Sequence, residues 1–345
     1  MKNAALIGLG MVAKTHLDAL ASAETVNLIG VMGRDFSKTS KIAQETTRVL
    51  GYDVTPYADV SAVASDPRVD FVILATPPDA RREIMLPLVS SGKPILLEKP
   101  IERTLKSAEQ LVTMCENANV PLAVMFQHRA REASAHLKEM VSQGKLGQIT
   151  AAEVRIPWWR DQSYYESPGR GTYARDGGGV LLTQAIHTLD LALWILGPVS
   201  RVQAMLTTTR THQLEAENWA GALFETTSGA VGTIMATTTA FPGSSETITL
   251  HGTQASAHLE SGVLAIHHHD GTSKALGETA ATGGGADPMA FTHAWHQTVI
   301  EQFAASLDGR AQALSTGRDA LAVHALIATM ERSSHTGQWA EISLP

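Results

Sequence analysis

The sequence predicts an α/β protein in which a doubly wound parallel sheet is followed by an α+β domain with a large open, mainly antiparallel sheet. Two observations carry this prediction. Over the first third of the chain, short apolar runs alternate with helical patterns, which is typical of a parallel sheet with helical crossovers. From residue 149 onward, closely spaced strand patterns alternate apolar and polar residues, which indicates a sheet with one buried face. We expect the two domains to cover residues 1–122 and 123–345.

A glycine-rich turn follows the first strand, which we place at residues 4–7. The turn reads Gly8-Leu9-Gly10-Met11-Val12-Ala13, and a helix follows to about residue 22. This is the G-x-G-x-x-G/A fingerprint of a dinucleotide-binding Rossmann domain, in its strand–turn–helix context. Gly8 permits the tight turn, and Gly10 lets the backbone approach a pyrophosphate. We expect the phosphates to bind at the helix N-terminus, against Gly8, Gly10, Met11 and Val12.

The residues after the second strand, at 27–32, bear on the choice of cofactor. An acid directly after this strand would bind the adenosine ribose, but Gly33 and Arg34 come first here and Asp35 only afterwards. Arg34 is suited to pair with a 2′-phosphate. The sequence therefore favours NADP(H), and NAD(H) stays open through Asp35.

The remaining strands of this sheet bring two more loops to the same edge. We place a third strand near residues 52–54, a fourth at 69–75, a fifth at 95–98 and a sixth at 122–126, with helices between them. The carboxyl ends of such strands line the ligand crevice of an open α/β sheet. We therefore expect the crevice to receive two loops, Ala75-Thr76-Pro77 and Glu98-Lys99-Pro100.

The second half is predicted to form an antiparallel sheet. Strand patterns cover residues 149–155, 199–208, 219–226, 230–240, 246–251, 257–260 and 262–267, and helices close the chain at about 289–307 and 317–333. The face rich in threonine is either solvated or a surface that meets another subunit.

Polar and aromatic residues gather between residues 155 and 190. They include Trp158, Tyr164 and Arg170, followed by Gly177-Gly178-Gly179, which we interpret as a flexible turn before a helix over residues 180–196. On that helix Thr183, His187 and Asp190 share one face. The alternative to a catalytic histidine is a core histidine held by Asp190.

Two other groups of histidines are interpreted structurally, and we predict no metal site. His267-His268-His269-Asp270 alternates sides of a strand, so these side chains cannot converge on one ion, and a hairpin end at Asp270-Gly271 explains them better. His16, behind the glycine turn, is interpreted as a structural or phosphate-side residue.

Composition narrows the class of partner. The 345 residues, 44% of them hydrophobic, are enough for two cores. A formal net charge of −7 with mixed signs gives no basic stripe for nucleic acid, and no run is long and apolar enough to span a membrane. The single Cys115 fits a reducing compartment. We therefore expect a cytoplasmic protein whose partner is a small molecule.

Several motifs combine into a resemblance to a known family. They are the glycine turn with His16, Ala75-Thr76-Pro77, Glu98-Lys99-Pro100, Gly177-Gly178-Gly179 and His187-Thr188-Leu189-Asp190. The chain resembles the Gfo/Idh/MocA oxidoreductases, the family of glucose-fructose oxidoreductase and inositol dehydrogenase, over nearly its whole length. The resemblance implies an open sheet in the second domain that mediates homodimers or homotetramers. It also implies a catalytic lysine at Lys99 beside a cis-proline at Pro100, and a histidine near the substrate hydroxyl at His187.

These side chains suit the oxidation of a secondary alcohol. His187 titrates in the range needed to accept the hydroxyl proton, and the Lys99 ammonium would stabilise the developing alkoxide. Glu98 is expected to hold the nicotinamide ribose. Substrate contacts are expected from Lys99, Trp158, Tyr164, Arg170, Thr183 and His187.

The sequence departs from the family pattern at three positions. Thr183 stands where the family commonly has an Asp or Asn, Pro78 replaces a usual Asn, and Arg81 replaces a usual His. The predicted activity is NAD(P)-dependent hydride transfer to or from a sugar, sugar acid, cyclitol or related cyclic polyol. Two alternatives stay open: a dehydrogenase of a non-sugar dihydrodiol, and a non-catalytic dinucleotide-binding sensor.

Overall fold

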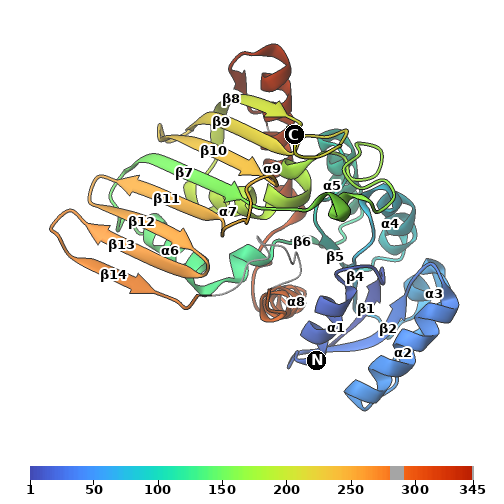
Figure 1. Cartoon of the computed structure of the whole chain (residues 1–345). Helices are drawn as coiled ribbons and strands as arrows, with labels where there is room; N and C mark the ends of the chain where they lie inside the picture. The colour runs from blue at the N-terminus through green and yellow to red at the C-terminus, as the bar shows by residue number, and fades with distance from the viewer. Residues whose placement is uncertain (280–290, 344–345) are drawn as a thin grey trace. The chain divides into compact units, whose positions relative to one another are not determined.

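The chain folds into two compact units, which a computed structural model describes over residues 1–279 and 291–343 (Figure 1). The first unit contains Met1–Glu102, Lys106–Gln127 and Thr292–Ala320. The second contains Arg103–Leu105, the described part of His128–Phe291, and the described part of Leu321–Pro345.

The first unit holds a six-stranded sheet in the order β3-β2-β1-β4-β5-β6, and every paired neighbour is parallel. Its strands are β1 (Lys2–Ile7), β2 (Val26–Met32), β3 (Thr55–Pro56), β4 (Phe71–Leu74), β5 (Ile95–Glu98) and β6 (Leu122–Met125). Its helices include α1 (Ala13–Ala21), α2 (Phe36–Leu50), α3 (Val60–Ser65), α4 (Arg81–Ser90), α5 (Leu105–Asn117) and α8 (Ala294–Ser306). This order confirms the predicted doubly wound Rossmann sheet.

The middle of this sheet explains why short apolar runs predict it. Every residue of β4 and of β5 is buried, as expected for parallel strands covered on both faces by helices. Asp35 is the N-cap of helix α2 and its side chain accepts from the Lys38 amide, and Gly51, in the left-handed conformation, is the C-cap.

The third strand lies later than predicted. Pairing with β2 begins at Thr55 rather than within residues 52–54. The cause is the end of α2, because the Val54 amide donates to the Thr47 hydroxyl at 3.0 Å and ties this stretch to the helix.

Helix α8 belongs to the first unit although it follows the second sheet in sequence. Glu301 accepts from the Glu24 and Thr25 amides, and Phe303 packs edge-on against Phe71 with ring centroids 5.5 Å apart. The predicted start of this helix, near residue 289, lies outside the described residues. The described helix begins at Ala294.

The second unit holds a nine-stranded sheet in the order β14-β13-β12-β11-β7-β10-β9-β8-β15 (Figure 1). Its strands are β7 (Ile149–Pro157), β8 (Val199–Thr207), β9 (Trp219–Thr226), β10 (Val231–Thr237), β11 (Thr247–Gly252), β12 (Ala255–Glu260), β13 (Val263–His268), β14 (Ser273–Leu276) and β15 (Ala340–Glu341). The pair β7–β10 is parallel and the other pairs are antiparallel. The predicted open, mainly antiparallel sheet is confirmed.

Helices cover one face of this sheet. They are α6 (Glu132–Ser142), which we did not predict, α7 (Ile186–Leu196) and α9 (Gly317–Thr336). Ser333 and Ser334 of α9 accept hydrogen bonds from the Ala204 and Leu206 amides of β8. The opposite face exposes Met205, Leu223 and Val231, on three neighbouring strands.

Candidate functional site

The glycine turn is shaped by the close approach of two loops. Gly8 has φ +106°, and a Cβ there would lie 2.5 Å from the carbonyl carbon of Ala75, so only glycine fits. A Cβ at Gly10 would meet no described atom within 4 Å, so the backbone there is accessible. Val12 begins α1 without a side-chain cap. The amides beside Gly10, Met11 and Val12 therefore fit a pyrophosphate.

The end of β2 presents an arginine and an engaged aspartate. Arg34 is exposed, whereas the Asp35 carboxylate accepts from the Lys38 amide at 3.1 Å. Asp35 therefore acts as the N-cap of α2, a role that competes with a ribose contact.

Arg81 joins the two loops that follow β4 and β5. Its guanidinium is fully buried and donates to the Thr76 carbonyl at 2.9 and 3.1 Å and to the Ile101 carbonyl at 3.1 Å. Burial lowers the pKa of Arg81 to about 10, opposed by the charges of Glu98 and Glu102. The Thr76 hydroxyl is buried with no hydrogen-bond partner among the described residues, which fits a donor or acceptor for a bound dinucleotide.

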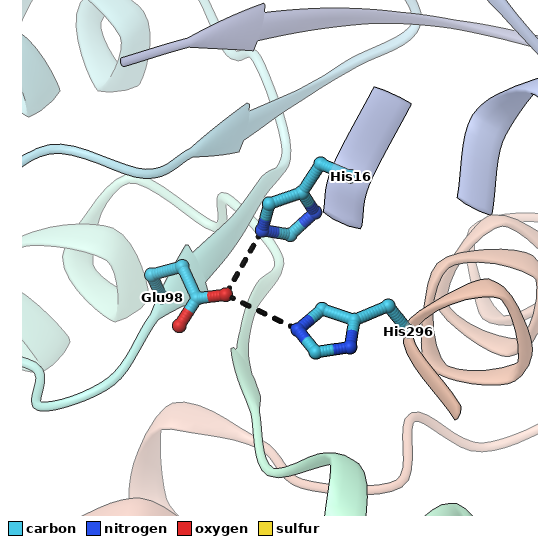
Figure 2. Close-up of side chains that lie close together, drawn as sticks. All are labelled: His16, Glu98 and His296. Carbon is cyan, nitrogen blue, oxygen red and sulfur yellow. Dashed lines mark hydrogen bonds and ion pairs between the residues drawn. The ribbon is translucent and has the colours of Figure 1, made fainter. Parts of the chain in front are cut away.

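Glu98 ends β5 in a buried cluster with two histidines (Figure 2). Its Oε1 lies 2.9 Å from Nε2 of His16 and 3.6 Å from Nε2 of His296, and its Oε2 accepts from the Lys99 amide at 3.2 Å. Burial would raise the pKa of Glu98, but the interactions of its carboxylate with both histidines hold that pKa well below its ordinary value. The Lys99–Pro100 bond is cis, as the resemblance implies.

In the second unit, His187 and Asp190 are buried on α7 beside partners from the segment before α6. The His187 ring stacks on His128 with centroids 5.0 Å apart. Arg129 donates to both oxygens of Asp190, at 2.6 and 2.7 Å. The Asp190 carboxylate therefore has a bidentate ion-pair partner in Arg129, which the sequence did not indicate.

A distant glutamate holds the start of this helix. Gly179 and Leu181 donate their amides to the two carboxylate oxygens of Glu217, at 2.9 and 3.0 Å. A Cβ at Gly179 would lie 1.8 Å from the Glu217 carbonyl, so this glycine allows close packing, and Gly177 in the turn before the helix has φ +82°. The segment η4 (Leu181–Ala185) is π-helical, and Thr183 donates its hydroxyl to the Gly179 carbonyl at 2.7 Å.

Three predicted substrate residues line one recess in the second unit. Tyr164, Arg170 and Thr183 line a small recess of about 20 Å³, together with Asp176, Gln184, Leu214 and Glu217. The guanidinium carbon of Arg170 lies 4.2 Å from the centre of the Tyr164 ring. Trp158 is buried under Arg160, and its indole N–H has no acceptor within the described ranges. These groups suit a polar ligand with an apolar face.

The structure therefore gathers the predicted residues into two groups, one in each unit. Gly8, Gly10, Ala75, Thr76, Pro77, Glu98 and Lys99 lie at the carboxyl edge of the first sheet. Trp158, Tyr164, Arg170, Thr183 and His187 belong to the second unit. Sequence reasoning missed His296, Arg129 and Glu217, because each acts on a partner far away in the sequence. The histidine tract at 267–270 forms the predicted hairpin, in which Asp270 accepts from Thr272.

Comparison with known proteins assigns the family. The model of the oxidoreductase family with an NAD-binding Rossmann fold matches residues 2–126, and that of the GFO/IDH/MocA C-terminal domain matches residues 134–258. An uncharacterized oxidoreductase of Synechocystis is 26% identical over 59% of this chain, and the match spans about half (53%) of that protein. D-apiose dehydrogenase of Paraburkholderia graminis is 24% identical over 98% of this chain and 89% of its own.

Solved structures share the whole fold. The WlbA dehydrogenase of Chromobacterium violaceum, in complex with NADH and UDP-GlcNAcA, is 26% identical and has a TM-score of 0.81, covering 100% of this chain and 96% of its own.

No helix within the described residues is both long and apolar enough to cross a membrane.

Proposed function

The chain belongs to the Gfo/Idh/MocA family of NAD-binding oxidoreductases, and we propose that it transfers a hydride between a nicotinamide dinucleotide and a secondary alcohol or ketone of a sugar, sugar acid or cyclitol. One observation carries the proposal. The accessible backbone at Gly10, the uncapped start of α1 and the Glu98-Lys99-Pro100 loop all lie at the carboxyl edge of one parallel sheet.

The first unit would hold the cofactor. The amides at Gly10, Met11 and Val12 would bind the pyrophosphate, and the Thr76 hydroxyl would supply a further hydrogen bond. A bound nicotinamide supplies the hydride acceptor or donor. Exposed Arg34 favours NADP(H), since Asp35 already caps α2, although the WlbA relative was solved with NADH.

The cofactor preference is tested by comparing kcat/KM for the two dinucleotides. Arg34→Gln should lower kcat/KM for NADP(H) by about 10- to 100-fold and leave NAD(H) nearly unchanged, because a single charge-assisted contact is worth about 1.5–3 kcal/mol. Equal losses of kcat/KM with both cofactors would contradict the proposal that Arg34 binds the 2′-phosphate.

Lys99 and His187 are the proposed catalytic pair. The His187 imidazole would accept the hydroxyl proton of the substrate, and the Lys99 ammonium would stabilise the alkoxide that develops as the carbinol carbon loses its hydride. In the reductive direction the same groups would return the proton. The stacking of His128 on His187 fixes the plane of the imidazole.

The second unit would bind the substrate. Tyr164, Arg170 and Thr183 offer hydroxyl groups and a cation above an aromatic face, and these groups suit the hydroxyl groups and apolar face of a sugar ring. Two relatives support this class: one is named for the sugar D-apiose, and the WlbA dehydrogenase was solved in complex with UDP-GlcNAcA, a nucleotide-linked sugar acid.

We also propose a homodimer or homotetramer formed through the exposed sheet face, and a cytoplasmic location. Met205, Leu223 and Val231 are 60%, 51% and 55% exposed on neighbouring strands, and together they form an apolar patch of the kind that meets another subunit. Light scattering on Leu223→Lys would report a smaller species. The buried thiol of Cys115 fits a reducing compartment.

The central test follows nicotinamide absorbance while the protein is offered either dinucleotide with sugars, sugar acids and cyclitols. Lys99→Met and His187→Ala should each fold, bind dinucleotide and lose at least about 100-fold in kcat, as expected for groups in proton transfer and charge stabilisation. Rates like those of the unmodified protein in both variants would overturn the assignment.

A further inference from the structure

The cluster of His16, Glu98 and His296 is not used in the proposed chemistry. Its members come from α1, the end of β5 and α8, and in Figure 2 both imidazoles point at the same carboxylate oxygen. The exposed fraction is 0% for the His16 side chain, 1% for His296 and 8% for Glu98. Burying three ionisable groups is costly, so their arrangement has to be satisfied internally.

We propose that His16 and His296 are positioning residues: His16 donates its Nε2–H to Glu98, and His296 directs its Nε2–H at the same oxygen from 3.6 Å, so that the fixed carboxylate holds the backbone of Lys99 in place for the reaction. This inference rests on the proposed role of Lys99. Its last link is the hydrogen bond of 3.2 Å from the Lys99 amide to Oε2 of Glu98.

The position of the protons follows from the other ring nitrogen. Nδ1 of His16 is buried and has no hydrogen-bond partner in the described part of the chain. A proton there would be an unsatisfied buried donor, which costs about 1–3 kcal/mol. The favoured tautomer of His16 therefore carries its proton on Nε2, where Glu98 accepts it.

The same geometry resembles a metal site, since the candidate ligand atoms lie within 4.8 Å of one another. A metal would need the lone pair of each Nε2, which would move the proton of His16 to the unsatisfied Nδ1. A metal would also add positive charge to a cluster that already interacts with two cations. Arg81 of α4 interacts with Glu98, and Lys99 interacts with His296. Glu102 is the other acid that interacts with Arg81. A hydrogen-bonded carboxylate fits these charges better.

The first experiment compares two substitutions of His296 that differ in one donor. His296→Gln keeps an N–H that can reach the carboxylate, whereas His296→Leu removes it. His293→Gln, at the N-cap of the same helix, is the matched control. We expect kcat to fall about 100-fold in His296→Leu, as for a misplaced reactive group, and to stay within about 3-fold in His296→Gln and in the control. Dinucleotide Kd should change little in all three.

The pH profile separates positioning from a loss of packing. Removing a donor raises the pKa of Glu98. The activity of His296→Leu should therefore rise with pH as Glu98 ionises, which adds an acidic limb to its pH–activity profile. A uniform loss at every pH, or equal kcat in His296→Leu and the control, would overturn the proposal.

A second readout does not depend on turnover. In protein labelled with ¹⁵N-histidine and ¹⁵N-lysine, the ring resonances of His16 and His296, assigned from their Gln variants, should show neutral Nε2–H tautomers at pH 8. The Lys99 amide resonance should move in His296→Leu and stay in His296→Gln. Nδ1–H tautomers, or one equivalent of zinc that survives dialysis and is lost in His296→Gln, would instead establish a metal site. Absence of any substrate turnover would contradict the proposed function alone, because the tautomers and the Lys99 amide would still decide this inference.

Discussion

The candidate sites of the two units are formed by different kinds of groups. The first unit presents main-chain groups at the ends of adjacent strands, and its buried side chains, Arg81 and Glu98, hold loops in place. The second unit presents side chains, and some of them are held by a partner from another segment, as Asp190 is held by Arg129. A main-chain site requires a local sequence pattern and tolerates little change there. A side-chain site requires distant partners, and its local sequence is freer to vary.

The largest effect is expected where two backbones meet. Gly8→Val would place a Cβ 2.5 Å from Ala75 in a left-handed conformation, so we expect a loss of about 3 kcal/mol in unfolding free energy and no measurable dinucleotide binding. Gly10→Ala is the control, because its Cβ has open space. It should change stability by less than about 1 kcal/mol and still weaken dinucleotide binding. Urea unfolding and fluorescence titration measure both quantities. Equal destabilisation by the two variants would break the comparison.

In the second unit, the buried ion pair should dominate stability. Arg129→Met leaves the Asp190 carboxylate buried without its bidentate partner, and breaking such a pair costs about 3–5 kcal/mol. Arg201→Met removes an arginine of the same sheet domain from its half-exposed pair with Glu225, and should cost less than about 1 kcal/mol. The difference in urea midpoints checks this. A double variant with Asp190→Asn should recover part of the loss, and no recovery would point to packing against Trp194 instead.

A smaller effect is expected from changing how the first unit holds its loops. Arg81→Lys keeps the charge but cannot donate to both the Thr76 and Ile101 carbonyls in the same geometry. We expect a loss of about 1–3 kcal/mol and a higher Kd for the dinucleotide. The control is Arg82→Lys, at the exposed next position. If both variants bind the dinucleotide equally well, Arg81 is not needed to shape that edge.

This contrast explains what the sequence could reveal. Strand–turn–helix order, buried apolar runs and the glycine turn predicted the first sheet and the place of Gly8, Thr76 and Lys99, because parallel strands of this kind share one functional edge. Period-2 alternation predicted the second sheet. The error at residues 52–54 arose from a side-chain hydrogen bond of Thr47, which no periodicity shows.

The partners of site residues were beyond the reach of the sequence. Arg129 reaches Asp190 across 61 positions, and His16 reaches Glu98 across 82. Glu217 lies in a loop, and the sequence around it does not indicate that its carboxylate accepts from the Gly179 amide at the start of the helical segment that leads into α7. A hydrogen bond of this kind depends on tertiary packing, so a pattern can show that a polar residue is present but not what it meets.

The smallest expected effect concerns two neighbouring acidic residues of the second unit, Glu217 and Glu331. Burial and the negative charge of Glu217 raise the pKa of Glu331 to about 7, well above the ordinary value of 4.5. Between these two values the unfolded chain has released a proton that the folded chain keeps, so unfolding free energy falls as pH rises through this window and levels off above it. Glu331→Gln removes this dependence.

The Glu331→Gln variant should therefore be more stable than the unmodified protein at pH 8, by about 1–2 kcal/mol after allowance for its partial exposure, and similar at pH 5. Urea midpoints at the two pH values measure the difference, with the exposed Glu341→Gln as the control. If the urea midpoints of all three proteins changed equally with pH, ionisation of Glu331 would cost no folding stability. In that case the second unit would tolerate two neighbouring carboxylates at the helix that carries His187, and its site would be more polar than its burial suggests.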